Sequence, residues 1–189
     1  EVVEQLGWSA PDHIVVPVAS GSLFTKIWKG LNELQTLRLI DGVATKMHVA
    51  QPYGCAPVAN AILDGNTHPK PVIPETIAKS LAIGNPADGY YSIDIANKSK
   101  GTANIVAETD IAEGIKLLAE TEGIFTETAG GVVISSLKRL AESGKIGKDQ
   151  KTVALITGTG LKTIEAVKDS IKINTIEPNV QSFNEMFSR

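Results

Sequence analysis

Four short runs of apolar residues are continuous rather than alternating. They cover residues 14–18, 47–50, 103–107 and 153–156. Strands of this kind are typical of a parallel sheet that helices cover on both faces. The pattern therefore predicts four buried strands in one mainly parallel sheet.

Helical patterns lie between and after these runs. An amphipathic stripe extends from about residue 23 to residue 37, directly after the first predicted strand. A second stripe follows Asp110, which could form a capping box with Glu113, and Gly123 is placed to end that helix.

Three weaker signals complete the pattern. A helix over residues 132–140 would stop at Gly144, and residues 76–83 form a short helical run inside a proline-rich connector. Residues 1–6 have the spacing of the last turns of a helix, so we expect this sequence to be part of a longer chain. The alternation of strands and helices predicts a single α/β domain, residues 1–189, with three αβα layers and right-handed crossovers.

Composition adds few constraints. Hydrophobic residues make up 42% of the 189 residues and charged residues 21%, which is ordinary for a globular protein with one core. The net charge of −3 is spread without blocks of one sign, so nucleic acid is not an expected partner. No apolar stretch approaches the roughly 20 residues needed to cross a bilayer, so we expect no membrane partner.

The chain holds one cysteine and three histidines. Cys55 cannot form an internal disulfide, which indicates a reduced protein of the cytoplasm. His13, His48 and His68 share no spacing with Cys55 that resembles a metal site. We therefore assign these four side chains to packing or to the surface.

The first candidate for chemistry is the turn Ala19-Ser20-Gly21-Ser22, between the first predicted strand and its helix. Small residues let backbone N–H groups approach an anion there, and the helix dipole favours negative charge. The turn is therefore a candidate phosphate cup. The alternative is that any such crossover needs small, N-capping residues at this place, whether or not an anion binds.

The second candidate is Thr157-Gly158-Thr159-Gly160, at the carboxyl end of the last predicted strand. A hydroxyl such as that of Thr157 can hydrogen-bond a heteroaromatic nitrogen without forcing that nitrogen to carry a proton. A glycine-bearing loop without any ligand is the alternative. Because ligands collect at the carboxyl ends of parallel strands, we expect the two loops to share one cleft.

A third group of small residues spans residues 125–131. Glu127 could face the cleft, and Gly130-Gly131 could allow close packing of helices. Equally, Thr126 or Thr128 could cap the helix that follows. Asn85 precedes a proline and is held extended, which suits a turn and only secondarily a ligand contact.

Taken together, these stretches resemble threonine synthases over essentially the whole chain. The resemblance rests on four motifs in the order that this family has them. They are Val16-Pro17 with residues 19–23 and Trp28-Lys29-Gly30; Ile83-Gly84-Asn85-Pro86-Ala87; Glu122-Gly123-Ile124-Phe125 with Glu127 and Ala129; and the run from Leu155 to Lys162 that contains Thr157.

The resemblance implies a fold-type-II, tryptophan synthase β-like enzyme that uses pyridoxal 5′-phosphate (PLP). It implies that O-phospho-L-homoserine and water are converted to L-threonine and phosphate by a homodimer of the full-length enzyme, located in the cytoplasm or, if the source is a plant, in the plastid stroma. The cofactor-binding residues that it implies are Ala19, Ser20, Gly21, Ser22 and Leu23 for the phosphate and Thr157 for the pyridine nitrogen.

Two departures from the family pattern affect the site. The phosphate loop of the family reads Gly-Asn-Ala-Gly-Asn, and here Leu23 stands where its second asparagine would be. No lysine lies in the serine-rich Lys-Asp-Arg context that holds the cofactor aldehyde in the family. The Schiff-base lysine is therefore expected upstream of Glu1, and no catalytic residue is assigned in this chain.

Two alternatives remain open. Another PLP enzyme of the same fold, such as a cysteate synthase or a threonine dehydratase, would share both cofactor loops. A non-catalytic binding module with this fold would explain the missing lysine, although truncation explains it more simply.

Overall fold

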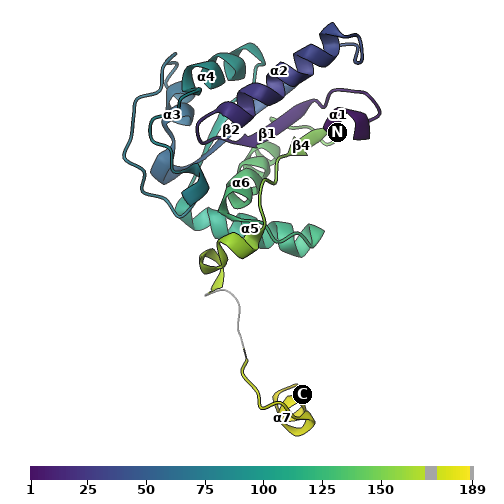
Figure 1. Cartoon of the computed structure of the whole chain (residues 1–189), viewed down its shortest axis with the longest axis vertical. Helices are drawn as coiled ribbons and strands as arrows, with labels where there is room; N and C mark the ends of the chain where they lie inside the picture. The colour runs from purple at the N-terminus through teal and green to yellow at the C-terminus, as the bar shows by residue number, and fades with distance from the viewer. Residues whose placement is uncertain (169–173, 188–189) are drawn as a thin grey trace.

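Four parallel strands form one sheet at the centre of the protein. The computed structural model describes residues 1–168 and 174–187. The sheet has the order β3-β2-β1-β4, with β1 at His13–Pro17, β2 at Lys46–Pro52, β3 at Ala103–Val106 and β4 at Thr152–Ala154 (Figure 1). The predicted parallel sheet is confirmed, each strand lying within a few residues of its apolar run.

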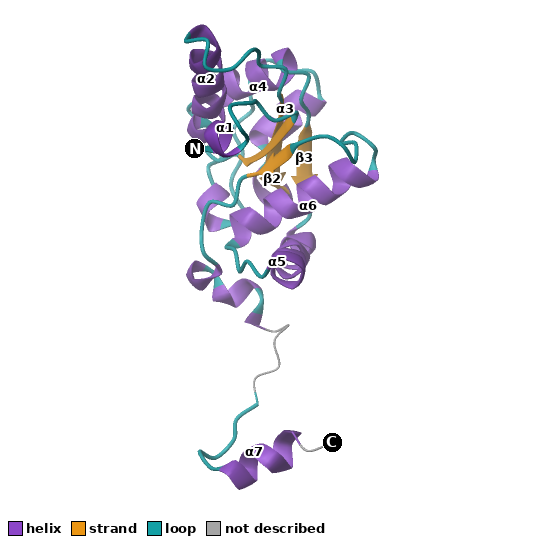
Figure 2. Ribbon diagram, turned by 90° about the vertical axis from the view of Figure 1, so that its right-hand side faces the viewer, coloured by secondary structure: helices purple, strands orange, loops and turns teal. Residues whose placement is uncertain are grey.

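Helices cover both faces of this sheet, as Figure 2 shows. One face carries α2 (Ser22–Thr36), α3 (Pro57–Leu63) and α4 (Gly89–Lys98). The other carries α6 (Thr128–Glu142), with α5 (Glu108–Glu122) packed on its outer side. The expected α/β fold with αβα layers is confirmed.

Two cores result, because successive side chains of a strand point to opposite faces. Ile14 and Val16 of β1 pack in the core beneath α2, α3 and α4, whereas Val15 packs in the core beneath α6. All five residues of β1 are buried. A strand that is buried on both faces needs apolar residues at every position, which explains the continuous runs.

The strand β4 differs from the expectation of a fully buried strand. It is three residues long and each of its residues is only half-buried, because β4 lies at an edge of the sheet. One further pairing bond follows it, from the Leu155 N–H to the Val15 carbonyl oxygen at 3.1 Å. Thr157 therefore lies in a loop beyond the strand.

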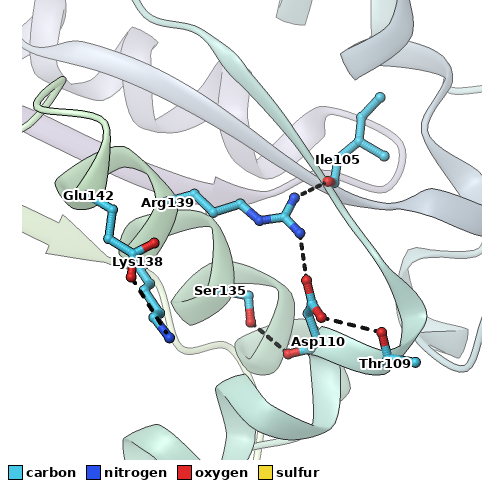
Figure 3. Close-up of polar contacts among 7 residues, drawn as sticks. All are labelled: Ile105, Thr109, Asp110, Ser135, Lys138, Arg139 and Glu142. Atoms are coloured by element: carbon cyan, nitrogen blue, oxygen red, sulfur yellow. Dashed lines mark hydrogen bonds and ion pairs between the residues drawn. The ribbon is translucent and has the colours of Figure 1, made fainter.

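The predicted capping box at the start of α5 is wrong. The helix begins at Glu108, with Ala107 before it, and no side chain caps it. Asp110 instead accepts a hydrogen bond from the Arg139 guanidinium of α6, which also donates to the Ile105 carbonyl oxygen at 2.6 Å (Figure 3). This pairing fastens the two helices to the edge strand β3. The end of α5 is as expected, because Gly123 follows it with a φ of 69°.

The helix expected over residues 76–83 is also wrong, since only the short 3₁₀ turn η2 (Lys79–Leu81) forms there. The Thr76 hydroxyl and the Ile77 N–H both donate to the Glu108 carboxylate, at 2.9 Å each. The same carboxylate accepts the Gly54 N–H at 3.0 Å. These long-range bonds hold the segment extended where a helix would have used local ones.

Smaller elements complete the described chain. They are α1 (Val2–Gln5), α7 (Val180–Phe187) and the 3₁₀ turns η1 (Tyr53–Cys55), η3 (Gly160–Lys162) and η4 (Ile164–Ala166). Among the residues that the structure describes, every helix is too short or too polar to cross a lipid bilayer.

Two of the three histidines form a buried pair between β1 and β2. His13 Nδ1 lies 2.9 Å from His48 Nε2, and the Thr102 N–H donates to His48 Nδ1 at 3.3 Å. His48 therefore carries its proton on Nε2 and donates it to His13. Burial, reinforced by the nearby charges of His13, Lys46 and Lys145, lowers the pKa of His48 to about 4.

This pair should make the fold sensitive to acid. The unfolded chain takes up the His48 proton near pH 6.5 and the folded protein only near pH 4, so stability is lost as the pH falls through this window. The pKa difference corresponds to about 3 kcal/mol. Urea unfolding at several pH values should show that the free energy of unfolding decreases between pH 6.5 and pH 4. His48→Gln should flatten the slope of this dependence on pH. The exposed His68 supplies the control, since His68→Gln should leave the slope unchanged; an unchanged slope in His48→Gln would refute the assignment.

Candidate functional site

The turn between β1 and α2 holds one residue in the left-handed region of backbone conformation. Gly21 has a φ of 97° and directly precedes α2. A Cβ atom there would lie 2.5 Å from the Ser92 hydroxyl oxygen and 2.9 Å from the Asp88 carbonyl oxygen. Both the backbone conformation and the lack of space therefore require glycine at this position.

The backbone N–H groups of this turn remain largely available. The Ser22 N–H lies 3.4 Å from the Ser20 hydroxyl oxygen, which is long for a hydrogen bond. Within the described chain, the N–H groups of Ser20, Gly21 and Leu23 have no acceptor in the protein. Since they lie at the start of α2, the helix dipole favours an anion beside them.

A second segment, at the start of α4, holds the turn in place. The Asp88 N–H donates to the Ser20 carbonyl oxygen at 2.8 Å. The Ser22 hydroxyl donates to the Asp88 carboxylate at 2.6 Å, and the Ser92 hydroxyl donates to the Asp88 carbonyl oxygen at 2.9 Å. Asp88 thus connects the turn to α4, a contact that the sequence analysis did not identify.

A cavity of about 180 Å³ lies beside the turn, at the carboxyl ends of β1 and β4. It brings together the turn, the start of α6 and the loop after β4. Of the six residues predicted to bind the cofactor, five line this cavity, and Ser22 lies outside the lining with its hydroxyl on Asp88. The lining includes Ala19, Ser20, Gly21, Leu23, Glu127, Ala129 and Thr157. The expected shared cleft is present, and the cofactor roles stay predictions.

The loop after β4 is fastened to the residues before α6. The carbonyl oxygen of Gly158 accepts two hydrogen bonds at 3.0 Å, one from the Thr126 hydroxyl and one from the Glu127 N–H. The Gly160 N–H donates to the Phe125 carbonyl oxygen at 3.0 Å. These bonds hold the exposed Thr157 at the rim of the cavity.

Glu127 brings a carboxylate into the cavity wall. The residue is only 6% exposed, and a Cβ atom on Gly158 would lie 2.3 Å from Glu127 Oε1. Within the part of the chain that the structure describes, this carboxylate has no hydrogen-bond or ion-pair partner. It directly precedes α6, whose dipole stabilises a negative charge.

The small residues at the start of α6 serve close packing. A Cβ atom on Gly131 would lie 2.3 Å from the Ile111 carbonyl oxygen, and one on Gly114 would lie 2.3 Å from the Gly131 carbonyl oxygen. Close contact of α5 and α6 is therefore confirmed. Capping of α6 by Thr126 or Thr128 is wrong, because Glu127 is the residue before the helix and its side chain makes no capping bond. The Thr163 hydroxyl instead accepts the Thr128 N–H at 3.2 Å.

Larger hollows lie elsewhere, two of them against the helices that cover the sheet. One of about 410 Å³, between α5 and α6, is lined largely by charged side chains, including the paired Asp110 and Arg139 of Figure 3. The other, about 610 Å³, is an open groove between α2 and α4. Neither lies at the carboxyl ends of the strands or beside unpaired backbone donors. The smaller cavity is therefore the better candidate for a ligand site.

Two other kinds of reactive site find no support among the described residues. No cluster of three or more His, Cys, Asp or Glu side chains within the described residues could hold a metal ion. Cys55 is fully buried, and burial raises the pKa of its thiol, which disfavours the nucleophilic thiolate. These findings agree with the assignment of Cys55 to packing.

The sequence analysis missed Gln51, a buried residue that supports the turn from β2. Its side-chain N–H₂ donates to the Val18 carbonyl oxygen at 2.9 Å, directly before the turn. Its side-chain oxygen accepts the N–H groups of Val58 and Ala59, at 3.0 and 2.9 Å, at the start of α3. A polar residue at the end of an apolar run, directly before Pro52, was the available signal.

Sequence comparisons relate most of the chain to known proteins. A family described as "pyridoxal-phosphate dependent enzyme" matches residues 1–158. The threonine synthase of Methanocaldococcus jannaschii is 38% identical over 181 residues, which are 92% of this chain and 44% of that protein. The threonine synthase of Methanosarcina acetivorans is 34% identical, over 98% of this chain and 46% of that protein. The chain thus spans about half the length of these relatives.

Solved structures share the fold at lower identity. An L-serine ammonia-lyase from Rhizomucor miehei aligns with a TM-score of 0.67 and 20% identity, over 90% of this chain and 53% of its own. The processed threonine deaminase isoform 2 of Solanum lycopersicum gives a TM-score of 0.66 and 20% identity, over 91% and 47% of the two chains. At this identity the likeness concerns the fold alone.

Proposed function

This chain belongs to the pyridoxal-phosphate dependent enzyme family, and from that premise we propose that it is the carboxy-terminal part of a threonine synthase. The full enzyme would convert O-phospho-L-homoserine and water to L-threonine and phosphate, and we expect it to act as a homodimer. The relatives named threonine synthase, at 34% and 38% identity over nearly all of the chain, support this choice.

The turn after β1 fits the phosphate group of PLP. The observation that carries the proposal is the combination of unpaired N–H groups at the start of α2 with Gly21, where a Cβ atom has no room. The amides of Ser20, Gly21 and Leu23 would hold the phosphate. The Ser22 hydroxyl is engaged by Asp88 and would contribute less. Leu23 can contribute only its backbone N–H, so the turn would bind the phosphate mainly through backbone groups.

The opposite part of the cavity suits the ring end of the cofactor. Thr157 lines the same cavity as the turn, and its hydroxyl could hydrogen-bond the pyridine nitrogen. When bound, PLP withdraws electrons from carbanions at the α and β carbons of the amino acid, which assists loss of phosphate from the γ carbon and addition of water at the β carbon. The residues of this chain would bind and orient the cofactor for that chemistry.

The cavity would form only one side of the complete site. Its volume of about 180 Å³ is below the roughly 300–1,000 Å³ that is usual for small-molecule sites. We propose that the other half of the protein supplies the remaining wall, together with the lysine that carries the cofactor. The threonine dehydratase alternative is supported by likeness of fold alone.

The proposal is tested by phosphate release from O-phospho-L-homoserine in the full-length protein that contains this chain. We expect turnover that depends on added PLP, and none from residues 1–189 alone. Thr157→Val should lower cofactor affinity or rate from a few-fold to about a hundred-fold, because a lost hydrogen bond costs about 0.5–3 kcal/mol, depending on whether its partner is left unpaired. Thr157→Ser is the control and should retain activity. Failure of the full-length protein to release phosphate would refute the proposal.

A further inference from the structure

Asp88 ends a series of hydroxyl groups that begins in the turn between β1 and α2. The Ser20 hydroxyl donates to the Ser22 hydroxyl oxygen at the longer distance of 3.3 Å, and the Ser22 hydroxyl donates to the Asp88 carboxylate at 2.6 Å. The second bond is short, as is usual where the acceptor is charged. Both hydroxyl protons therefore point along this series towards Asp88.

The direction of this series matters because serine side chains at the start of a helix compete for its N–H groups. A serine in such a place usually accepts one of these N–H groups and so caps the helix. Here Gly21 is the residue before α2, and no side chain caps the helix. The Ser20 hydroxyl oxygen lies 3.4 Å from the Ser22 nitrogen, which is too long for a good cap. The N–H groups of the turn are therefore left for a ligand.

We propose that Asp88 is a positioning residue that keeps the turn open to phosphate by holding these two hydroxyl groups away from the free N–H groups. This inference rests on the proposed function, because it takes the turn to bind the phosphate of the cofactor. Without the Asp88 carboxylate, the Ser22 hydroxyl loses its acceptor, and the Ser20 hydroxyl is free to close on the N–H groups. Asp88 thus acts on binding without touching the ligand.

The backbone of Asp88 provides a separate anchor that no change of its side chain removes. The Asp88 N–H donates to the Ser20 carbonyl oxygen at 2.8 Å, and the Ser92 hydroxyl donates to the Asp88 carbonyl oxygen at 2.9 Å. The turn should therefore keep its place against α4 in both Asp88→Ala and Asp88→Asn. Both variants remove the same charge, but only asparagine can still accept the Ser22 hydroxyl. A difference between them reports this hydrogen bond.

The test measures the affinity of inorganic phosphate and of pyridoxamine 5′-phosphate for the full-length protein that contains this chain, after its cofactor has been removed. Asp88→Asn should bind both as tightly as the parent or a few-fold more tightly, because a nearby negative charge is lost. Asp88→Ala should bind both roughly ten-fold more weakly than Asp88→Asn. Asp94→Ala is the control, since this carboxylate of α4 pairs with Lys98 at 2.7 Å, and it should leave both affinities unchanged.

A second substitution distinguishes this role from a merely structural one. Adding Ser20→Ala to Asp88→Ala should restore phosphate affinity to the level of Asp88→Asn, because the hydroxyl that competes for the N–H groups is gone. A structural defect would not be repaired by a further deletion. Ser22→Ala keeps the charge of Asp88 and should also bind phosphate roughly ten-fold more weakly than the parent. It keeps the inference testable if Asp88→Ala fails to fold.

The outcomes separate this inference from the proposed function. Equal affinities of Asp88→Ala and Asp88→Asn would overturn the inference, and so would a lack of rescue by Ser20→Ala. Either result leaves the proposed function in place if the parent binds pyridoxamine 5′-phosphate. A parent that binds only inorganic phosphate overturns the proposed function, and the variants then still decide the role of Asp88 at the turn. A parent that binds neither ligand overturns both.

Discussion

Replacing Gly21 by alanine is expected to lower the melting temperature by about 10 °C and to weaken anion binding at the turn. An L-residue at a φ of 97° is strained, and the new Cβ atom would lie 2.5 Å from the Ser92 hydroxyl oxygen and 2.9 Å from the Asp88 carbonyl oxygen. Strain and overpacking together cost about 3 kcal/mol, or about 10 °C in a chain of this size. Thermal unfolding and phosphate titration measure the two effects.

Gly30 is the matched control, because it lies within α2 and a Cβ atom there would meet nothing within 4 Å. Gly30→Ala should raise stability by about 0.5–1 kcal/mol, as alanine favours a helix. Adding Ser92→Ala to Gly21→Ala should restore only part of the loss, since the Asp88 carbonyl oxygen remains close. Equal effects of Gly21→Ala and Gly30→Ala would contradict the assigned geometry.

Gln51→Leu is expected to destabilise the fold even more, by about 3–9 kcal/mol. The change removes the hydrogen-bond partners of three backbone groups, the Val18 carbonyl and the N–H groups of Val58 and Ala59. Each unsatisfied buried group costs about 1–3 kcal/mol. Because the stability of a domain is only about 5–15 kcal/mol, urea unfolding should show a large shift of the midpoint.

The exposed Gln35 of α2 supplies the control for this change. Gln35→Leu makes the same substitution without removing a buried hydrogen bond, and it should alter stability by no more than about 0.5 kcal/mol. A similar, small effect of both substitutions would show that Gln51 does not support the turn.

The strands and the helices beside the sheet could be predicted because their signals are local. A strand covered on both faces is apolar at every position, and Val15 and Val16 show why, since they enter different cores. The start of α2 was predictable for a similar reason. A turn of small residues that directly follows a buried strand is compatible with few local structures other than the start of a helix.

The errors arose where distant residues decide the local structure. Asp110 pairs with Arg139 across two helices instead of capping its own. Residues 76–77 are held by Glu108, more than 30 positions later, so their helical pattern is overridden. The spacing of residues within one segment does not reveal contacts with residues far away in the sequence. The same limit hid Gln51 and Asp88, which reach the turn from β2 and from the start of α4.

The site could be predicted in part from the sequence. The fold-type-II architecture follows from the family and from the solved structures of similar fold. Two glycine-bearing loops at strand ends were expected to share a cleft, and they line one cavity. That Glu127 would be unpaired could not be foreseen, because it depends on every side chain around the cavity.

The edge strand β4 also bears on the order in which the protein folds. It pairs with β1 across most of the chain, as the bond from the Lys151 N–H to the Asp12 carboxylate, 139 positions apart, illustrates. Closing so long a loop costs more entropy than pairing β1 with β2. The pairing of a strand of only three residues offsets little of this cost. β4 should therefore dock late in folding and be among the first strands to detach. Thr157 follows it, so the cavity is assembled only after the rest of the sheet exists.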